Sequence, residues 1–191
     1  MGMVLILKCL TNASRERILS DPKEISLCLD MDFDEEEVEV EPERDPHFDE
    51  PEFDIDKSWD VLCFLFCGAS YGTETDERSF PASFLFPMSG VVNMSDDDFF
   101  GYGPPWIYSP REVEEIANFL DTQTTEQLRA KFTPAVMKEV DAYPSIWDEH
   151  EDAQSPEWEE EWEYFSNHLS ELKQFVRDTA DRNLALLFYL S

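Results

Sequence analysis

An acidic run from Asp30 to Asp56 interrupts this chain and limits what can be built around it. Fifteen of its twenty-seven residues are Asp or Glu, and Arg44 is the only Lys or Arg within it. Carboxylates this dense repel one another, and the prolines in the run oppose regular structure. We therefore expect residues 31–53 to form an inserted loop that is either mobile or held by a cation or a partner.

The chain as a whole is nevertheless composed like a folded protein. Its 191 residues are 42% hydrophobic and 14% aromatic, whereas acidic disordered chains are poor in aromatic residues. We expect one domain over residues 1–191 with a sizeable core. The net charge of -30 repels nucleic acid and anionic membranes, so neither is predicted as a partner. Basic partners, cations or simple solubility remain as explanations of the charge.

Apolar patterns predict strands at both ends of the chain and helices between them. The apolar runs at residues 4–10 and 184–190 are typical of buried strands, which we expect to lie side by side. A further short strand is expected at residues 83–86. Helix starts are predicted from capping residues that precede apolar stripes, at Thr11 or Asn12, Pro22, Asp56, Ser109, Thr124, Thr133 and Ser155.

The four cysteines have apolar neighbours in the sequence. We expect Cys9, Cys28, Cys63 and Cys67 to be reduced core residues, because a zinc site would more usually show a close CxxC pair. The sequence has no recognisable signal peptide and no apolar stretch long enough to span a bilayer, which predicts a cytoplasmic protein. Phosphate-binding and nucleophile motifs are also missing, so no cofactor and no catalytic residue is predicted.

One metal pattern falls inside the acidic run. Four carboxylates match ligand positions of a twelve-residue calcium loop, although Glu35 stands where the sharp turn needs glycine. We therefore expect diffuse attraction of cations rather than a calcium site. The four candidate ligands are Asp30, Asp32, Asp34 and Glu41.

Lys57 is a cation within an acidic segment, and it defines the candidate ligand site. Asp60 follows three positions later, within ion-pair reach on a helix. A capping network at a helix start is the simpler interpretation, and a small polar pocket near the glycine-rich loop is the functional one. The candidate ligand-binding residues are Lys57, Trp59, Asp60, Gly101, Tyr102, Gly103 and Trp147.

Several segments carry a family resemblance. They are Met1-Gly2-Met3, residues 54–68 (DIDKSWDVLCFLFCG), Gly101 to Pro104, and residues 137–147 with their Tyr-Pro pair. In these the chain resembles the YfbM-like family, small bacterial cytosolic proteins of unknown function. Members often have histidine where Cys63 stands, and the acidic insertion is longer here. The resemblance implies an α+β fold, with several helices packed on a small sheet that includes the N- and C-terminal strands. It implies no reaction, cofactor or catalytic residue.

The sequence favours a non-catalytic binding protein for a basic protein partner. Small acidic proteins occur as immunity partners of bacterial toxins, so neutralisation of a toxin domain is one form that such binding could take. The alternative is a small-molecule-binding protein or enzyme with a site near Lys57, Asp60 and Tyr102, and a calcium-responsive surface is a third hypothesis. The carboxylates expected to contact a basic partner are Asp34, Glu35, Glu36, Glu37, Glu159, Glu160 and Glu161.

Overall fold

The computed structural model describes residues 2–27, 29, 45–48, 50, 52–71, 79–86, 89–93, 102–147 and 152–191. Within them, one four-stranded antiparallel sheet has the order β2-β1-β4-β3. The strands are β1 (Leu5–Leu10), β2 (Phe53–Asp54), β3 (Trp106–Tyr108) and β4 (Ala185–Leu190). The α-helices are α1 (Asn12–Ser20), α2 (Trp59–Cys67), α3 (Pro110–Thr122), α4 (Thr125–Arg129), α5 (Pro134–Val140) and α6 (Pro156–Asp181). Two 3-10 helices, η1 (Pro22–Leu27) and η2 (Asp56–Ser58), complete the elements.

The two terminal strands form the centre of the sheet, as the sequence predicts. β1 and β4 pair along their full length, from Leu5 opposite Leu190 to Leu10 opposite Ala185. Successive side chains of a strand point to opposite faces, so an apolar run supplies both faces. In β4, Leu186 and Phe188 join one buried cluster, whereas Leu187 joins a second. The continuous apolar sequence is therefore explained by a sheet buried on both sides.

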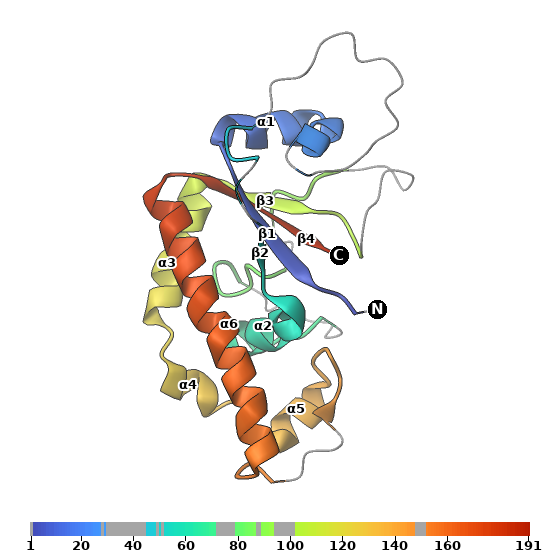
Figure 1. Ribbon diagram of the computed structural model, residues 1–191, viewed down its shortest axis with the longest axis vertical. Helices are drawn as coiled ribbons and strands as arrows, with labels where there is room; N and C mark the ends of the chain where they lie inside the picture. The colour runs from blue at the N-terminus through green and yellow to red at the C-terminus, as the bar shows by residue number, and fades with distance from the viewer. Residues whose placement is uncertain are drawn as a thin grey trace.

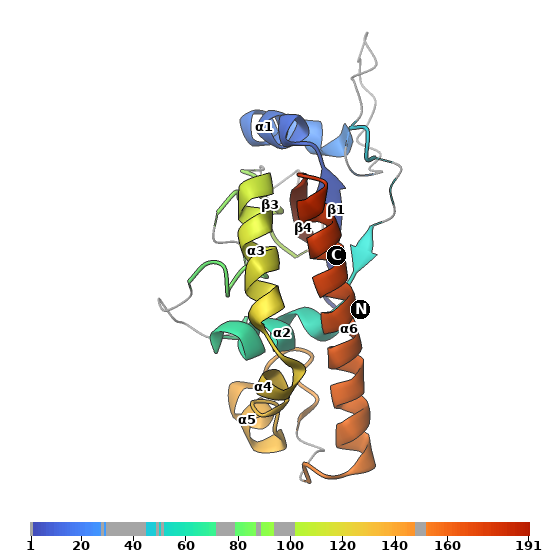
Figure 2. The ribbon, with the colours of Figure 1, turned by 90° about the vertical axis from the view of Figure 1, so that its left-hand side faces the viewer.

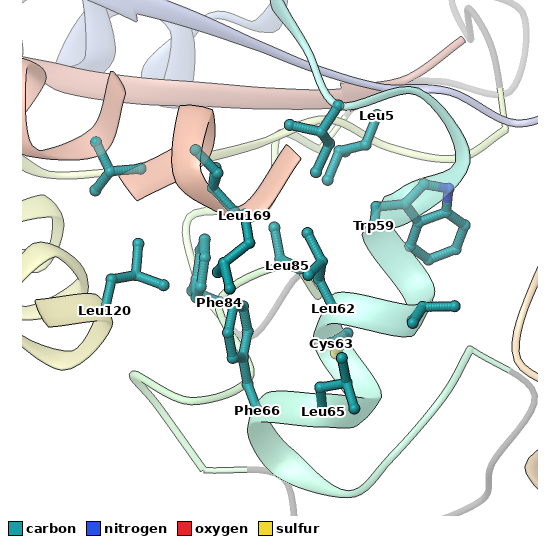
Figure 3. Packing of buried hydrophobic residues seen from close by; sticks show 14 of the residues in the cluster. Leu5, Trp59, Leu62, Cys63, Leu65, Phe66, Phe84, Leu85, Leu120 and Leu169 are labelled. Carbon is teal, nitrogen blue, oxygen red and sulfur yellow. The ribbon is translucent and has the colours of Figure 1, made fainter. Parts of the chain in front are cut away.

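Helices cover the two faces unequally. α2, α3 and α6 pack on one face, and α3 lies beside α6 for much of its length (Figures 1 and 2). α1 and η1 cover the other face through Ile18 and Ile25. Figure 3 shows α2 at the centre of the larger cluster, where its side chains meet those of β1, α3, α6 and the segment around Phe84. This α+β arrangement is the one expected from the sequence.

The predicted capping residues begin most of the helices. Ser109 and Glu112 form a reciprocal capping box at α3, and Thr124 and Gln127 form another at α4. Thr11, Thr133 and Ser155 accept backbone N–H groups at the starts of α1, α5 and α6. The predicted apolar stripe of α6 is buried throughout: Trp158, Trp162, Phe165, Leu169, Leu172 and Val176.

Two predictions about local structure are wrong. Asp56 does not cap α2, because it lies in η2 with a φ of 47°, and Ser58 precedes α2 without a side-chain cap. Residues 83–86 form turns rather than a strand. The Tyr108 hydroxyl lies 3.0 Å from the oxygens of both Phe84 and Phe86 and shares its proton between them, and the Ser83 oxygen accepts the Phe86 N–H at 2.9 Å.

No helix in the described part of the chain combines the length and the apolar character needed to cross a membrane.

Candidate functional site

A surface hollow of about 390 Å³ lies where η2, the loop after α5 and the first turns of α6 meet. Its lining combines carboxylates, one ammonium group and apolar side chains. The residues that line it are Asp56, Lys57, Pro144, Ile146, Glu160, Glu161, Tyr164 and Phe165. The hollow therefore presents three carboxylates against one lysine, beside an apolar wall.

Asp56 is fixed at this position by both its backbone and its side chain. Its left-handed backbone conformation turns the chain out of β2, and its N–H donates to the Asp54 carboxylate at 2.5 Å. The Tyr164 hydroxyl donates to Asp56 Oδ2 at 2.9 Å. Burial, and this bond to a carboxylate, raise the pKa of Tyr164 above its ordinary value, so the phenol stays a donor. The Asp56 carboxylate is thus held at the edge of the hollow.

Lys57 lies against the N-terminal segment of the chain. A side chain at Gly2 would collide with the Tyr143 hydroxyl and would come within 2.7 Å of Lys57 Cε. The same hydroxyl accepts a hydrogen bond from the Met3 N–H at 2.8 Å. Glycine at position 2 therefore allows the N-terminal segment, Lys57 and Tyr143 to pack closely. Of the predicted ligand-binding residues that the structure describes, Lys57 is the one that lines the hollow.

Asp60 lies beneath this surface and organises it. Its side chain is buried, with 1% of the residue exposed. Its two oxygens accept backbone hydrogen bonds from Tyr71 at 2.6 Å and Tyr143 at 2.8 Å. The Asp60 carboxylate therefore links the segment after α2 to the segment after α5. Its bond to Tyr143 holds the chain next to Pro144, which lines the hollow.

Trp59, Trp147, Tyr102 and Gly103, the other predicted ligand-binding residues that are described, do not line the hollow. Trp59 and Trp147 are each 1% exposed, and their indole N–H groups donate to the carbonyl oxygens of Met3 and Ala142. Tyr102 is 45% exposed but lies beside the end of β4, where its N–H donates to the Leu190 oxygen at 3.0 Å. Gly103 follows it in the same loop, and Gly101 is outside the described residues.

The predicted partner-binding glutamates of α6 have different surroundings. Glu159 is exposed and forms an ion pair with Arg129 at 2.8 Å. Glu160 is exposed and Glu161 is half-buried, and both line the hollow. The first turns of α6 thus bring two of the predicted partner residues next to the predicted ligand residue Lys57. The sequence analysis assigns these residues to separate sites. They come together because η2 packs beside α6, a contact between distant parts of the chain.

Most of the acidic run lies outside the described residues, including Asp34 to Glu37 and the calcium candidates Asp30, Asp32, Asp34 and Glu41. The described carboxylates near its end are held by the body of the protein. Asp45 is 3% exposed and accepts the Thr11 N–H at 2.9 Å and hydroxyl at 3.0 Å. Although burial opposes it, hydrogen bonds from the Ser14 side chain, Thr11 and the His47 N–H lower the pKa of Asp45.

Two further carboxylates of this segment are paired with cations. Glu50 accepts two hydrogen bonds from the Arg182 guanidinium, which lower the pKa of Glu50 to about 2. Glu52 lies 3.7 Å from the ammonium of buried Lys8. Glu50 and Glu52 are therefore paired with cations of the protein itself, so these two carboxylates are not available as attractive surface. The contact between Glu50 and Arg182 could not be predicted from the sequence, because the two residues are 132 positions apart.

Within the described residues, no group of three or more His, Cys, Asp or Glu side chains is placed to hold a metal ion. Cys9 and Cys63 are buried and Cys67 is half-buried, and Cys28 is outside the described part. His168 packs edge-on against Tyr164, with 4.6 Å between ring centroids, and its Nδ1 lies 3.8 Å from Glu171. His150 is not described.

The fold and the hollow define an α+β protein with an acidic surface site and no recognisable catalytic group among its described residues. The sequence pattern described as Domain of unknown function (DUF1877) matches residues 1–189, so the chain belongs to this family. Its fold is similar to the crystal structure of YfbM from Escherichia coli, a protein of unknown function. The TM-score is 0.66 and the identity 17%, over 98% of this chain and 99% of that one. No curated protein matches the sequence significantly.

Proposed function

We propose that this protein is a non-catalytic binding protein that holds a basic protein partner at the hollow and the adjoining acidic face of α6. The observation that supports this proposal is the chemistry of the hollow. Lysine and arginine side chains combine an apolar stem with a cationic head. The hollow offers Ile146 and Phe165 to the stem, and Asp56, Glu160 and Glu161 to the head.

The two α6 carboxylates are suited to an incoming cation. Glu159, one residue earlier, is already engaged by Arg129. Among the described residues, neither Glu160 nor Glu161 has an ion-pair partner within 4.0 Å. They are also exposed or half-buried, so they remain hydrated in the unbound protein and no buried charge is left uncompensated. The net charge of -30 would add long-range attraction, which increases association rates and is screened by salt.

Replacement of Lys57 distinguishes binding of a basic partner from binding of an anionic small molecule. Lys57 also lines the hollow, so its positive charge opposes the approach of another cation. Replacing it with methionine keeps most of the side-chain volume and removes the competing charge. Binding of a cation should therefore become tighter in Lys57→Met, whereas binding of an anionic small molecule, as in the alternative hypothesis, should become weaker.

The test measures the affinity of a short arginine-rich peptide by calorimetry at low salt. The variant Glu160→Gln/Glu161→Gln removes two carboxylates of the hollow. The control Glu114→Gln/Glu115→Gln removes two exposed carboxylates from α3, so the net charge changes equally. Exposed ion pairs contribute about 0.2–1 kcal/mol each, so the hollow variant should bind about two- to thirtyfold more weakly.

The control should change the affinity much less, and Lys57→Met should increase it. Equal losses in the two double variants would refute binding at the hollow, because net charge alone would then explain the attraction. A weaker interaction in Lys57→Met would also refute the proposal.

A further inference from the structure

Two thiols on α2 form a pair that the basic-partner proposal does not use. Cys63 Sγ and Cys67 Sγ lie 3.7 Å apart, one helical turn from each other. Cys63 is fully buried within the larger core cluster, next to Leu62 and Leu65 (Figure 3), and Cys67 is half-buried. Cys67 is the last residue of α2, and Gly68 ends the helix with a φ of 77°. The pair therefore reaches from the core to the end of the helix.

We propose that Cys63 and Cys67 bind one Cu(I) ion as a two-thiolate site. With a metal–sulfur bond of about 2.3 Å, two ligating sulfurs lie about 3.8 Å apart at a tetrahedral angle and about 4.6 Å apart in a linear complex. The observed separation of 3.7 Å lies just below this range, so rotation of the half-buried Cys67 side chain must widen it when the ion binds. Residues four apart on a helix share a face, which keeps both sulfurs directed to one point.

The number and type of ligand atoms in the site favour Cu(I) over other metals. Soft thiolate ligands favour Cu(I), zinc and iron–sulfur clusters. Structural zinc almost always takes four ligands, and the described residues place no third His, Cys, Asp or Glu with this pair. Cu(I) is stable with two thiolates, so the pair is sufficient for it.

The ion would enter from the Cys67 end of the helix. Apart from the chain neighbours Cys67 and Ala69, no described heavy atom lies within 4 Å of a Cβ built on Gly68, so the described residues leave space beside the helix end. Each thiol loses its proton to solvent as its sulfur bonds to the metal, and copper stays in the +1 state. The complex therefore carries one negative charge. Lys131, whose ammonium donates to the Leu65 oxygen at 2.6 Å, supplies a positive charge at the same end of α2.

The test titrates the reduced full-length protein with Cu(I) under anaerobic conditions, in competition with a chromogenic Cu(I) chelator. One ion should bind per chain, and X-ray absorption should show two sulfur neighbours. Cys67→Ser should lose more than about 100-fold in affinity, since changes to outer-shell partners alone cost about 10- to 100-fold. The matched control Cys9→Ser/Cys28→Ser should keep the affinity, and binding should strengthen as pH rises because two protons are released.

Circular dichroism of each variant separates loss of the site from loss of the fold. Failure to compete with the chelator would overturn the proposal, and so would unchanged affinity in folded Cys67→Ser. Zinc binding as tight as that of Cu(I) would also overturn it. None of these outcomes depends on whether a basic partner binds at the hollow.

Discussion

Replacement of Asp60 by alanine should strongly destabilise the protein. The carboxylate is 1% exposed and accepts the N–H groups of Tyr71 and Tyr143 at 2.6 and 2.8 Å. Alanine removes both acceptors, and a hydrogen bond to a charged group contributes about 1.5–3 kcal/mol. Because Tyr71 is 51% exposed, water can replace its lost acceptor at lower cost. We therefore expect Asp60→Ala to lower the free energy of unfolding by about 2–4 kcal/mol.

Urea unfolding followed by circular dichroism would measure this loss. Asp121→Ala is a suitable control, because it also removes one helical carboxylate, but an exposed one paired with Arg177. That change should cost less than about 1 kcal/mol. Asp60→Asn keeps one acceptor oxygen and should fall between wild type and Asp60→Ala. The structural role given to Asp60 is refuted if Asp60→Ala and Asp121→Ala unfold at the same urea concentration.

Two other predictions concern charge and capping. Arg182→Met should cost less than about 1 kcal/mol at neutral pH. Because the pKa of Glu50 falls from 4.5 to about 2 on folding, this difference should be constant above pH 4.5 and disappear as pH falls towards 2. A pH-independent difference in unfolding free energy would contradict it. Ser109→Ala removes the capping box of α3 and should cost about 0.5–2 kcal/mol in urea unfolding. A loss no larger than that of the exposed control Ser170→Ala would argue against the cap.

The elements best predicted from sequence are those whose signals are local. The cap at Ser109 and the buried stripe of α6 each lie within a few turns of chain, so periodicity and side-chain chemistry identify them. β2 and β3 have two and three residues, which is too short for an alternating pattern. They are strands because β1 and β4 offer them backbone partners. The prediction of a cap at Asp56 is wrong because the positive φ of this residue cannot be read from the sequence.

The candidate site could be predicted only in part. Lys57, Glu160 and Glu161 attract attention as unusual charges in the sequence, and all three line the hollow. Tyr164 is not among the predicted site residues, because its bond to Asp56 joins two positions 108 residues apart in the sequence. Trp147 is a predicted ligand residue, but large aromatic side chains are also the ones that fill cores, and it is 1% exposed. Which of these residues line the hollow depends on contacts between distant parts of the chain, which sequence patterns do not show.

Mapping where a cationic peptide binds tests the central proposal most directly. Backbone amide chemical shifts of the isotope-labelled protein would be followed during titration with the arginine-rich peptide. The largest saturable changes are expected at Lys57, Ile146, Glu160 and Glu161, with smaller ones along the exposed face of α3. Changes of similar size on both helices that never saturate, or changes absent from the hollow, would contradict a defined cation-binding surface.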